Sequence, residues 1–171
     1  TILVGFGPIS VLINNAGTIE TSLFQMTSIE KFKKIFQINF FSQIAFSQQI
    51  IKNMIKNKSG SIVYISSTSG IEGNEGRSAY SSSKAAIISK VKVLSKELGA
   101  FNIRVNAIAP GLTNTRMMNE NTSIKKINDV TKDLSLKRFG EPNEIGNTAL
   151  FLSSELSSYI TGQTIRVDGG M

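Results

Sequence analysis

Tyr80 and Lys84 are four positions apart, and Ser67 lies thirteen positions before the tyrosine. On a helix, a spacing of four places two side chains on the same face, so the phenol and the ammonium would be neighbours. The chain contains no histidine and no cysteine, which removes the most frequent general base and the usual thiol nucleophile. Any proton transfer must therefore use tyrosine, lysine or a carboxylate, and the same absence argues against a zinc or iron site.

The phenol of Tyr80 needs a favourable environment to exchange a proton near neutral pH, because its unperturbed pKa is about 10. The ammonium of Lys84 and a positively charged nicotinamide would both favour the phenolate and lower that pKa. Ser67 would then hold a substrate oxygen by a hydrogen bond while Tyr80 supplies or removes the proton. We therefore expect a substrate oxygen to lie between Ser67 and Tyr80.

Short β-branched runs alternate along the chain with long helical patterns. This alternation predicts an α/β fold, a parallel sheet with helices on both faces, and the length suits a single domain spanning residues 1–171. Gly99 is expected to stop a helix, and Pro142 suits a first helical turn. The predicted strands are 9–13, 61–65, 103–108 and 164–167, and the predicted helices are 28–56, 78–99 and a third that follows Pro142.

The residues of chemical interest fall at the carboxyl ends of three predicted strands, where open α/β sheets bind ligands. These ends are residues 14–17, 66–67 and 106–111, and each is rich in small or amide side chains. Turn formation explains each segment taken alone, and only their combination favours a site. The long polar stretch 112–136 is interpreted either as a lid over that site or as an insertion.

Together these motifs resemble the short-chain dehydrogenase/reductase family over nearly the whole chain. Residues 14–17 match its Asn-Asn-Ala-Gly motif, and Ser67, Tyr80 and Lys84 match its catalytic serine, tyrosine and lysine. Asn39 matches its helix asparagine, which holds a water that links the lysine to solvent. The resemblance implies hydride transfer between a nicotinamide cofactor and a carbonyl, with Lys84 also binding the nicotinamide ribose.

The same resemblance implies a fold and a set of cofactor contacts. The implied fold is a Rossmann-like doubly wound parallel sheet that lacks its N-terminal strands. Pro110 and Gly111 match the motif beside the nicotinamide, and Thr113 stands where main chain contacts the carboxamide. The cofactor-binding residues implied in this way are Asn15, Ala16, Gly17, Tyr80, Lys84, Pro110, Gly111, Thr113 and Thr115.

Residues 138–142 and 160–170 are most similar to those of the 3-oxoacyl-[acyl-carrier-protein] reductases of this family. This similarity favours reduction of a 3-oxoacyl thioester in fatty acid synthesis, with NADP(H) preferred over NAD(H) and acyl carrier protein as a partner. Lys58 matches a basic residue near the mouth of the site that receives the acidic carrier, whereas Phe101 stands where an arginine is common. Two alternatives stay open: a sugar, steroid or other secondary-alcohol dehydrogenase of the same family, and a non-catalytic fragment that acts as a binding module.

The amino-terminal third of the family has no counterpart in the sequence. Residues 5–10 imitate a glycine-rich turn, but they precede a strand instead of opening a helix, so we reject them as a pyrophosphate site. Residues 11–13 would then form an exposed apolar edge. We expect the isolated chain to bind cofactor poorly or to aggregate.

Composition and charge limit the remaining partners. The net charge is +7, and the scattered lysines favour a solvated surface over an anionic partner. No stripe of basic and aromatic residues indicates nucleic acid, and no segment is apolar enough to span a membrane. No signal peptide opens the chain, so we expect a cytoplasmic protein. The family resemblance further implies a homotetramer formed through helices 28–56 and 78–99.

Overall fold

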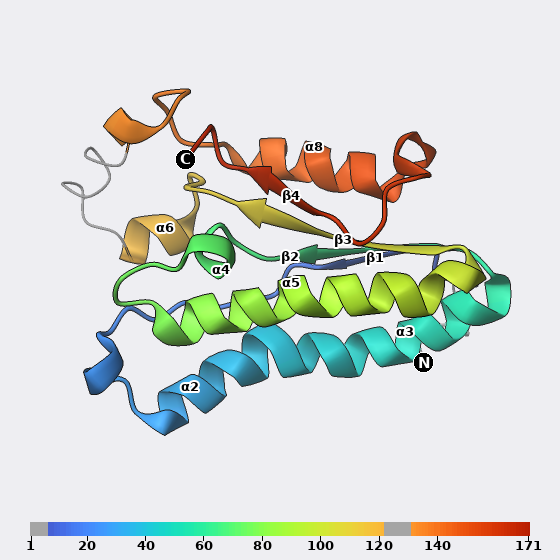
Figure 1. Ribbon diagram of the computed structural model, residues 1–171, viewed down its shortest axis with the longest axis horizontal. Coiled ribbons are helices and arrows are strands. Elements are labelled where there is room, and N and C mark those ends of the chain that lie inside the picture. Colours follow the sequence, from blue (N-terminus) through green and yellow to red (C-terminus); the bar gives the residue numbers. More distant parts are fainter. Residues whose placement is uncertain (1–6, 122–130) are drawn as a thin grey trace.

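Four parallel strands form one sheet in the order β1-β2-β3-β4 (Figure 1). The computed structural model describes residues 7–121 and 131–171. Because the strands are parallel, their carboxyl ends all lie at one end of the sheet. The strands, each within two residues of its predicted bounds, are β1 (Val11–Asn14), β2 (Gly60–Ile65), β3 (Ile103–Pro110) and β4 (Thr164–Val167).

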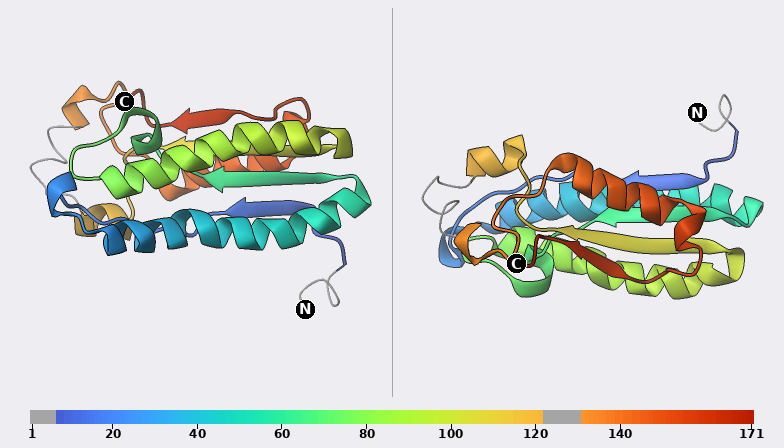
Figure 2. Two further views of the ribbon diagram at one scale, coloured as in Figure 1. Left: turned by 60° about the horizontal axis from the view of Figure 1, so that its bottom comes forward. Right: turned by 90° about the horizontal axis from the view of Figure 1, so that it is seen from above.

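Helices cover both faces of the sheet, as the alternating pattern predicts (Figures 1 and 2). The predicted helix 28–56 is one continuous helical stretch with a π-helical turn, Gln37–Phe41, in its middle. The helices on one face are α2 (Ile29–Phe36), α3 (Ser42–Asn57) and α5 (Ser78–Leu98), and the helix on the other face is α8 (Pro142–Ser153).

The two faces have separate apolar cores. Ile62 and Tyr64 of β2 pack toward α3 and α5, whereas Val63, between them, packs toward α8. All three side chains are fully buried. Alternation along a strand that is covered on both sides therefore explains why residues 61–65 read as a continuous apolar run.

α5 ends at Leu98 and Gly99 is its C-cap, so the helix stops where the sequence predicts. This glycine nevertheless keeps right-handed helical angles and opens a short 3-10 turn, Gly99–Phe101. The left-handed residue is Asn102, at φ 55°, whose N–H donates to the Gly99 carbonyl oxygen at 3.0 Å. Asparagine tolerates this conformation because its short polar side chain can bond locally, which leaves Gly99 free to continue the helical path.

The placement of Lys58 near the mouth of the site is wrong within this chain. Lys58 precedes the amino end of β2, whereas Ser67 follows its carboxyl end. The six residues of β2 separate the two positions by roughly 20 Å. Phe101 likewise precedes the amino end of β3. Both positions therefore lie at the opposite end of the sheet from the predicted site.

The stretch 112–136 is described in part. It contains α6 (Arg116–Asn121), while residues 122–130 lie outside the described residues. Leu134 is buried, and the N–H groups of Ser135 and Leu136 donate to the carbonyl oxygens of Gly170 and Gly169. The carboxyl end of the stretch is thus built into the fold, and its reading as a lid stays a prediction. Among the helices of residues 7–121 and 131–171, none combines the length and hydrophobicity needed to cross a bilayer.

Candidate active site

The four predicted catalytic residues come from three separate elements and are all buried. Ser67 follows β2, and Tyr80 and Lys84 lie in the first two turns of α5. Asn39 lies in the π-helical turn between α2 and α3. The exposed fractions of these residues range from 0% for Asn39 to 8% for Ser67 and Tyr80. The fold thus gathers residues distant in sequence around the carboxyl end of β2.

Ser67 is held in a turn that is fastened to α5. The Ser67 hydroxyl accepts a hydrogen bond from the Ser69 N–H at 3.1 Å. The preceding residue, Ser66, donates through its N–H to the Ile108 carbonyl oxygen at 2.7 Å and through its hydroxyl to the Lys84 carbonyl oxygen at 2.9 Å. Ser66 therefore sets the distance between the Ser67 turn and α5, a role that its position beside Ser67 did not reveal.

In the protein itself the pKa of Tyr80 is raised above its ordinary value, so the lowering expected from Lys84 does not occur, while the lowering expected from a nicotinamide stays a prediction. Burial is the largest cause and raises the pKa, while a hydrogen bond with the Ser67 side chain and the charge of Arg77 lower it. The Lys84 Nζ atom lies 5.7 Å from the centre of the Tyr80 ring and donates instead to the Ile65 carbonyl oxygen at 2.8 Å. The desolvated phenol is therefore neutral at neutral pH, the form that can donate a proton.

Lys84 is the most deeply placed charge of the site. Burial lowers the pKa of its ammonium to about 8. A side-chain carbon added to Gly17 would lie 3.4 Å from the Lys84 Nζ atom and 3.5 Å from the Asn39 Oδ1 atom. The missing side chain at Gly17 therefore leaves room beside the ammonium, which is the space that a ribose hydroxyl would need.

Asn39 fastens the segment after β1 to α5. Its Nδ2 group donates to the Thr18 carbonyl oxygen at 2.9 Å and to the Ser83 hydroxyl at 3.0 Å, and its Oδ1 atom accepts from the Thr18 N–H at 2.8 Å. Both amide hydrogens are thus engaged within the protein. The resemblance implies that Asn39 holds a water, and this role stays a prediction. Because both amide hydrogens are engaged, an oxygen of Asn39 would accept the hydrogen bond from that water.

The inner face of α3 also supports the last residue of β1 and the segment that follows it. Gln43 donates to the Ala16 carbonyl oxygen at 2.9 Å, and the Ser47 hydroxyl accepts from the Asn14 side chain at 3.2 Å. Both α3 side chains are buried although they are polar. In the sequence, only one feature could have indicated that these two residues support the end of β1: two polar residues four positions apart on an otherwise apolar helix face.

The predicted cofactor contacts lie at the carboxyl ends of β1 and β3. Asn15 and Ala16 are exposed just beyond β1. Gly111 follows β3, and its N–H donates to the Val167 carbonyl oxygen at 3.0 Å. The Thr115 hydroxyl accepts from the Met118 N–H at 3.3 Å, so it also supports the first turn of α6. The half-buried residues of this group are Gly17, Pro110, Gly111, Thr113 and Thr115.

These residues fit the nicotinamide half of a dinucleotide. They combine a buried ammonium, a glycine cradle and small residues at neighbouring strand ends. Neither 7–121 nor 131–171 contains a group of three or more acidic side chains placed to hold a metal ion. The arrangement therefore offers a hydrogen-bond donor for a sugar hydroxyl next to a buried serine and a buried phenol.

A parallel sheet with helices on both faces and a Ser-Tyr-Lys set at its carboxyl end defines a class of nicotinamide-dependent oxidoreductases. The family profile described as Enoyl-(Acyl carrier protein) reductase matches residues 1–171. The chain belongs to the short-chain dehydrogenase/reductase family.

Relatives and solved structures agree with this membership. The chain is 45% identical to a 3-oxoacyl-[acyl-carrier-protein] reductase of Chlamydia muridarum, over 99% of this chain and 68% of that protein. It is 41% identical to the enzyme of the same name from Thermotoga maritima, over 97% of this chain and 67% of the relative. The chain therefore spans about two thirds of the length of these relatives.

Among solved structures, an NAD+-bound xylitol dehydrogenase superposes with a TM-score of 0.94 at 29% identity, covering 99% of this chain and 71% of that one. A mutant 4-hydroxyisoleucine dehydrogenase complexed with NADH and succinate superposes with a TM-score of 0.89 at 35% identity, covering 94% of this chain and 67% of that one. These likenesses agree with the predicted Rossmann-like arrangement.

Proposed function

We propose that this chain provides the catalytic part of an NADPH-dependent reductase that converts a 3-oxoacyl thioester on acyl carrier protein into the 3-hydroxyacyl thioester. The observation that supports this proposal most directly is the gathering of Ser67, Tyr80 and Lys84 around one buried point beyond β2. The relatives that share 41–45% of their residues with the chain are named for this reaction.

In the proposed reaction, a ketone oxygen lies between the Ser67 hydroxyl and the Tyr80 phenol. A nicotinamide cofactor held beside Lys84 and Gly17 would supply the hydride for the carbonyl carbon. As negative charge develops on the oxygen, Ser67 stabilises it by a hydrogen bond and Tyr80 transfers its proton to it. The raised pKa of Tyr80 keeps the phenol protonated for this step.

Lys84 has two roles in this proposal. Its ammonium binds the nicotinamide ribose in the space that Gly17 leaves open. Its charge also stabilises the phenolate that Tyr80 becomes after proton transfer. Asn15, Ala16, Pro110, Gly111, Thr113 and Thr115 line the cofactor side of the site.

The 3-oxoacyl assignment competes with two others. The family profile carries the name of an enoyl reductase, which would reduce a carbon–carbon double bond. The structural likeness to xylitol dehydrogenase favours a sugar or another secondary alcohol with NAD as the cofactor. An oxygen placed between two hydroxyl groups suits a ketone, and so we favour carbonyl reduction.

The decisive experiment measures NADPH and NADH oxidation by the protein expressed from its complete coding sequence. Acetoacetyl thioester, crotonyl thioester and xylulose are the three substrates. We expect NADPH oxidation with acetoacetyl thioester, and a loss of at least about 100-fold in kcat for Tyr80→Phe, because this variant lacks the transferable proton. Tyr159→Phe, a change at a fully exposed tyrosine, is the matched control and should keep its activity.

Other outcomes would favour the alternatives. Activity with crotonyl thioester or xylulose alone would replace the 3-oxoacyl assignment. Full activity in Tyr80→Phe would refute the proposed proton transfer. No cofactor binding and no turnover would favour the non-catalytic binding module.

The assembly implied by the family is also a proposal here. Phe41, Phe46 and Val93, which lie along the 28–56 and 78–99 helical segments, are about half exposed. Apolar residues on two adjacent helices suit contact between copies of the chain. Sedimentation of the complete protein should give a homotetramer, and Phe46→Glu should dissociate it.

A further inference from the structure

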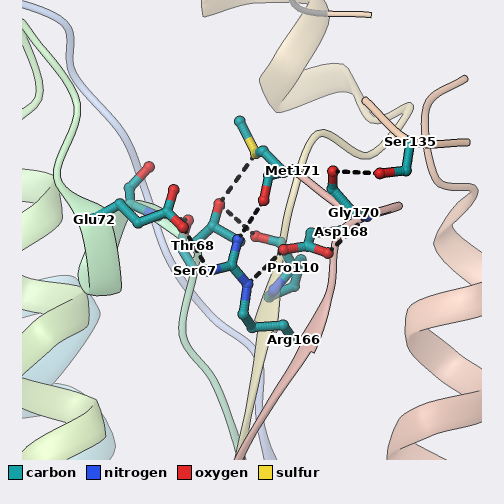
Figure 3. Close-up of polar contacts among 10 residues, drawn as sticks. Ser67, Thr68, Glu72, Pro110, Ser135, Arg166, Asp168, Gly170 and Met171 are labelled. Atoms are coloured by element: carbon teal, nitrogen blue, oxygen red, sulfur yellow. Dashed lines mark hydrogen bonds and ion pairs between the residues drawn. The ribbon is translucent and has the colours of Figure 1, made fainter. Parts of the chain in front are cut away.

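The guanidinium of Arg166 joins three parts of the chain at the carboxyl end of β4 (Figure 3). Its Nη1 atom donates to Glu72 at 2.5 Å, its Nε atom donates to Asp168 at 2.6 Å, and its Nη2 atom donates to the Met171 carbonyl oxygen at 2.8 Å. We call Arg166, Glu72, Asp168 and Met171 the Arg166 network. Glu72 lies 94 positions from Arg166 in the sequence, so the network links distant segments.

One side of the Arg166 network holds the short helix that follows Ser67. This helix is α4 (Ser69–Glu72). Its last residue, Glu72, carries the carboxylate that Arg166 binds. Before α4 begins, Thr68 donates through its N–H and its hydroxyl to the Pro110 carbonyl oxygen, at 3.0 and 3.3 Å. The helix is therefore anchored at its start by Thr68 and at its end by Arg166, with Ser67 immediately before the first anchor.

The other side of the network supports the segment after β3. Asp168 packs so closely on Gly111 that a side-chain carbon added to this glycine would lie 2.6 Å from the Asp168 Cβ atom. The second carboxylate oxygen of Asp168 accepts from the Gly170 N–H at 3.1 Å. A single guanidinium thus links the helix beside Ser67 with the segment expected to contact the cofactor.

The connection between α4 and α5 contains two glycines, so the contact of Arg166 with Glu72 is needed to hold the end of α4 in place. Gly73 and Gly76 both have left-handed φ angles, 77° and 73°, and residues 73–77 connect Glu72 to the helix that contains Tyr80. A backbone hydrogen bond from Ser22 to Gly76, at 2.8 Å, holds the far end of this connection. Arg166 supplies the corresponding contact at the near end.

We propose that Arg166 is a positioning residue that fixes α4, and with it Ser67, relative to Tyr80 and the nicotinamide side of the site. This role rests on the proposed ketone reduction. The carboxylates of Glu72 and Asp168 share one planar fork, which restricts direction as well as distance. Because the side chains of Arg166 and Glu72 are 36% and 46% exposed, the contact contributes little to stability and acts mainly through geometry.

The test compares Arg166→Ala, Arg166→Lys and Glu72→Ala in the complete protein. Arg104→Ala is the matched control, because this arginine also makes three polar contacts, to the carbonyl oxygens of Leu152 and Ser154 and to the Ser157 hydroxyl. Arg104 lies near the amino end of β3, far from the site. The measurements are kcat, KM for acetoacetyl thioester, KM for NADPH, and amide hydrogen exchange of residues 69–76.

For Arg166→Ala we expect kcat/KM for the ketone to fall about 10- to 100-fold, because small misplacements of a reacting group have effects of this size. Exchange of amides 69–76 should become about two- to fivefold faster, since α4 loses the contact that holds its end and an exposed ion pair contributes at most about 1 kcal/mol. The KM for NADPH should change less than about threefold. Arg166→Lys should recover only part of the activity. Lysine keeps the positive charge but lacks the planar guanidinium that binds two carboxylates at once.

Glu72→Ala should reproduce the effect of Arg166→Ala, and the double variant should be no worse than either single one. Arg104→Ala should keep its kcat and its exchange in residues 69–76. Unchanged exchange in Arg166→Ala, or an equal loss of activity in Arg104→Ala, would overturn the role of Arg166. If the unaltered protein reduced no ketone, the proposed function would fail, while the exchange measurement would still decide whether Arg166 holds α4.

Discussion

Lys90 places a second ammonium in the same helical layer as Lys84. Its Nζ atom lies 3.9 Å from the centre of the Tyr64 ring and 5.0 Å from that of Phe40. Within the described ranges this atom is buried and has no hydrogen-bond partner. Burial, followed by the charge of Lys84, lowers the pKa of Lys90 to about 8 from the ordinary 10.5. The native state therefore bears an unfavourable charge at neutral pH, which contacts with the two rings offset only in part.

This burial makes the contribution of Lys90 to stability dependent on pH. Between pH 8 and 10.5 the unfolded chain binds more protons at Lys90 than the folded chain does, so the free energy of unfolding rises with pH in this window. Below pH 8 the destabilisation is fully present. Lys90→Met should therefore raise the free energy of unfolding by about 1 kcal/mol at pH 7, and the gain should shrink toward pH 10.5.

Urea unfolding at pH 7 and pH 10 measures this difference. Lys92→Met on the exposed side of the same helix is the control, and it should shift the free energy by less than about 0.5 kcal/mol at either pH. An equal gain for Lys90→Met at both pH values would contradict the proposed origin of the effect.

At the scale of the elements, contact between α4 and α5 depends on Gly70. A side-chain carbon added there would lie 2.7 Å from the Lys84 carbonyl carbon and 2.8 Å from the Ala85 nitrogen. Both atoms belong to the backbone of α5 and cannot turn away as a flexible side chain could. The helix beside Ser67 therefore rests directly on the backbone at Lys84, and the distance between them requires glycine.

Gly70→Ala should lower the free energy of unfolding by about 1–3 kcal/mol, because the added carbon must force the two helices apart. Gly99→Ala is the matched control: this glycine has right-handed angles and no atom within 4 Å of the added carbon. We expect the control to be neutral or to stabilise by up to about 1 kcal/mol. Similar urea midpoints for the two variants would refute close packing at Gly70.

At the scale of the whole molecule, β1 is an edge strand of the described sheet. Leu12 is buried against the helices, whereas Val11 and Ile13 on its other face are 38% and 46% exposed. Residues 11–13 therefore form an apolar edge of the sheet that residues 7–121 and 131–171 build. Unpaired main chain beside exposed apolar side chains favours pairing with other chains.

Ile13→Lys should reduce self-association of the 171-residue chain, since a charge on an edge strand disfavours pairing. Light scattering at increasing protein concentration measures this. Leu150→Lys, which alters a 69% exposed side chain on α8 away from the edge, should have a smaller effect. The edge would not be responsible if both variants associated as strongly as the unaltered chain.

The sequence by itself was sufficient to predict the order of strands and helices and to single out Ser67, Tyr80 and Lys84 as candidates, which the fold then buries near the carboxyl end of β2. Strand and helix periodicities are local, and a spacing of four on α5 aligns two side chains whatever surrounds them. Long-range packing determined the remaining features. Burial, which spacing does not encode, raises the pKa of Tyr80 and lowers that of Lys84.

Tertiary structure also decided which distant residues meet. Arg166 reaches Glu72 only because β4 lies beside β3, whose end is bonded to the turn that leads into α4. Asn39 reaches Ser83 because the helical stretch 29–57 lies against α5. Lys58 is remote from Ser67 because they lie at opposite ends of β2. Such contacts join residues far apart in the chain, and their geometry follows from the packed layers, which no local pattern specifies.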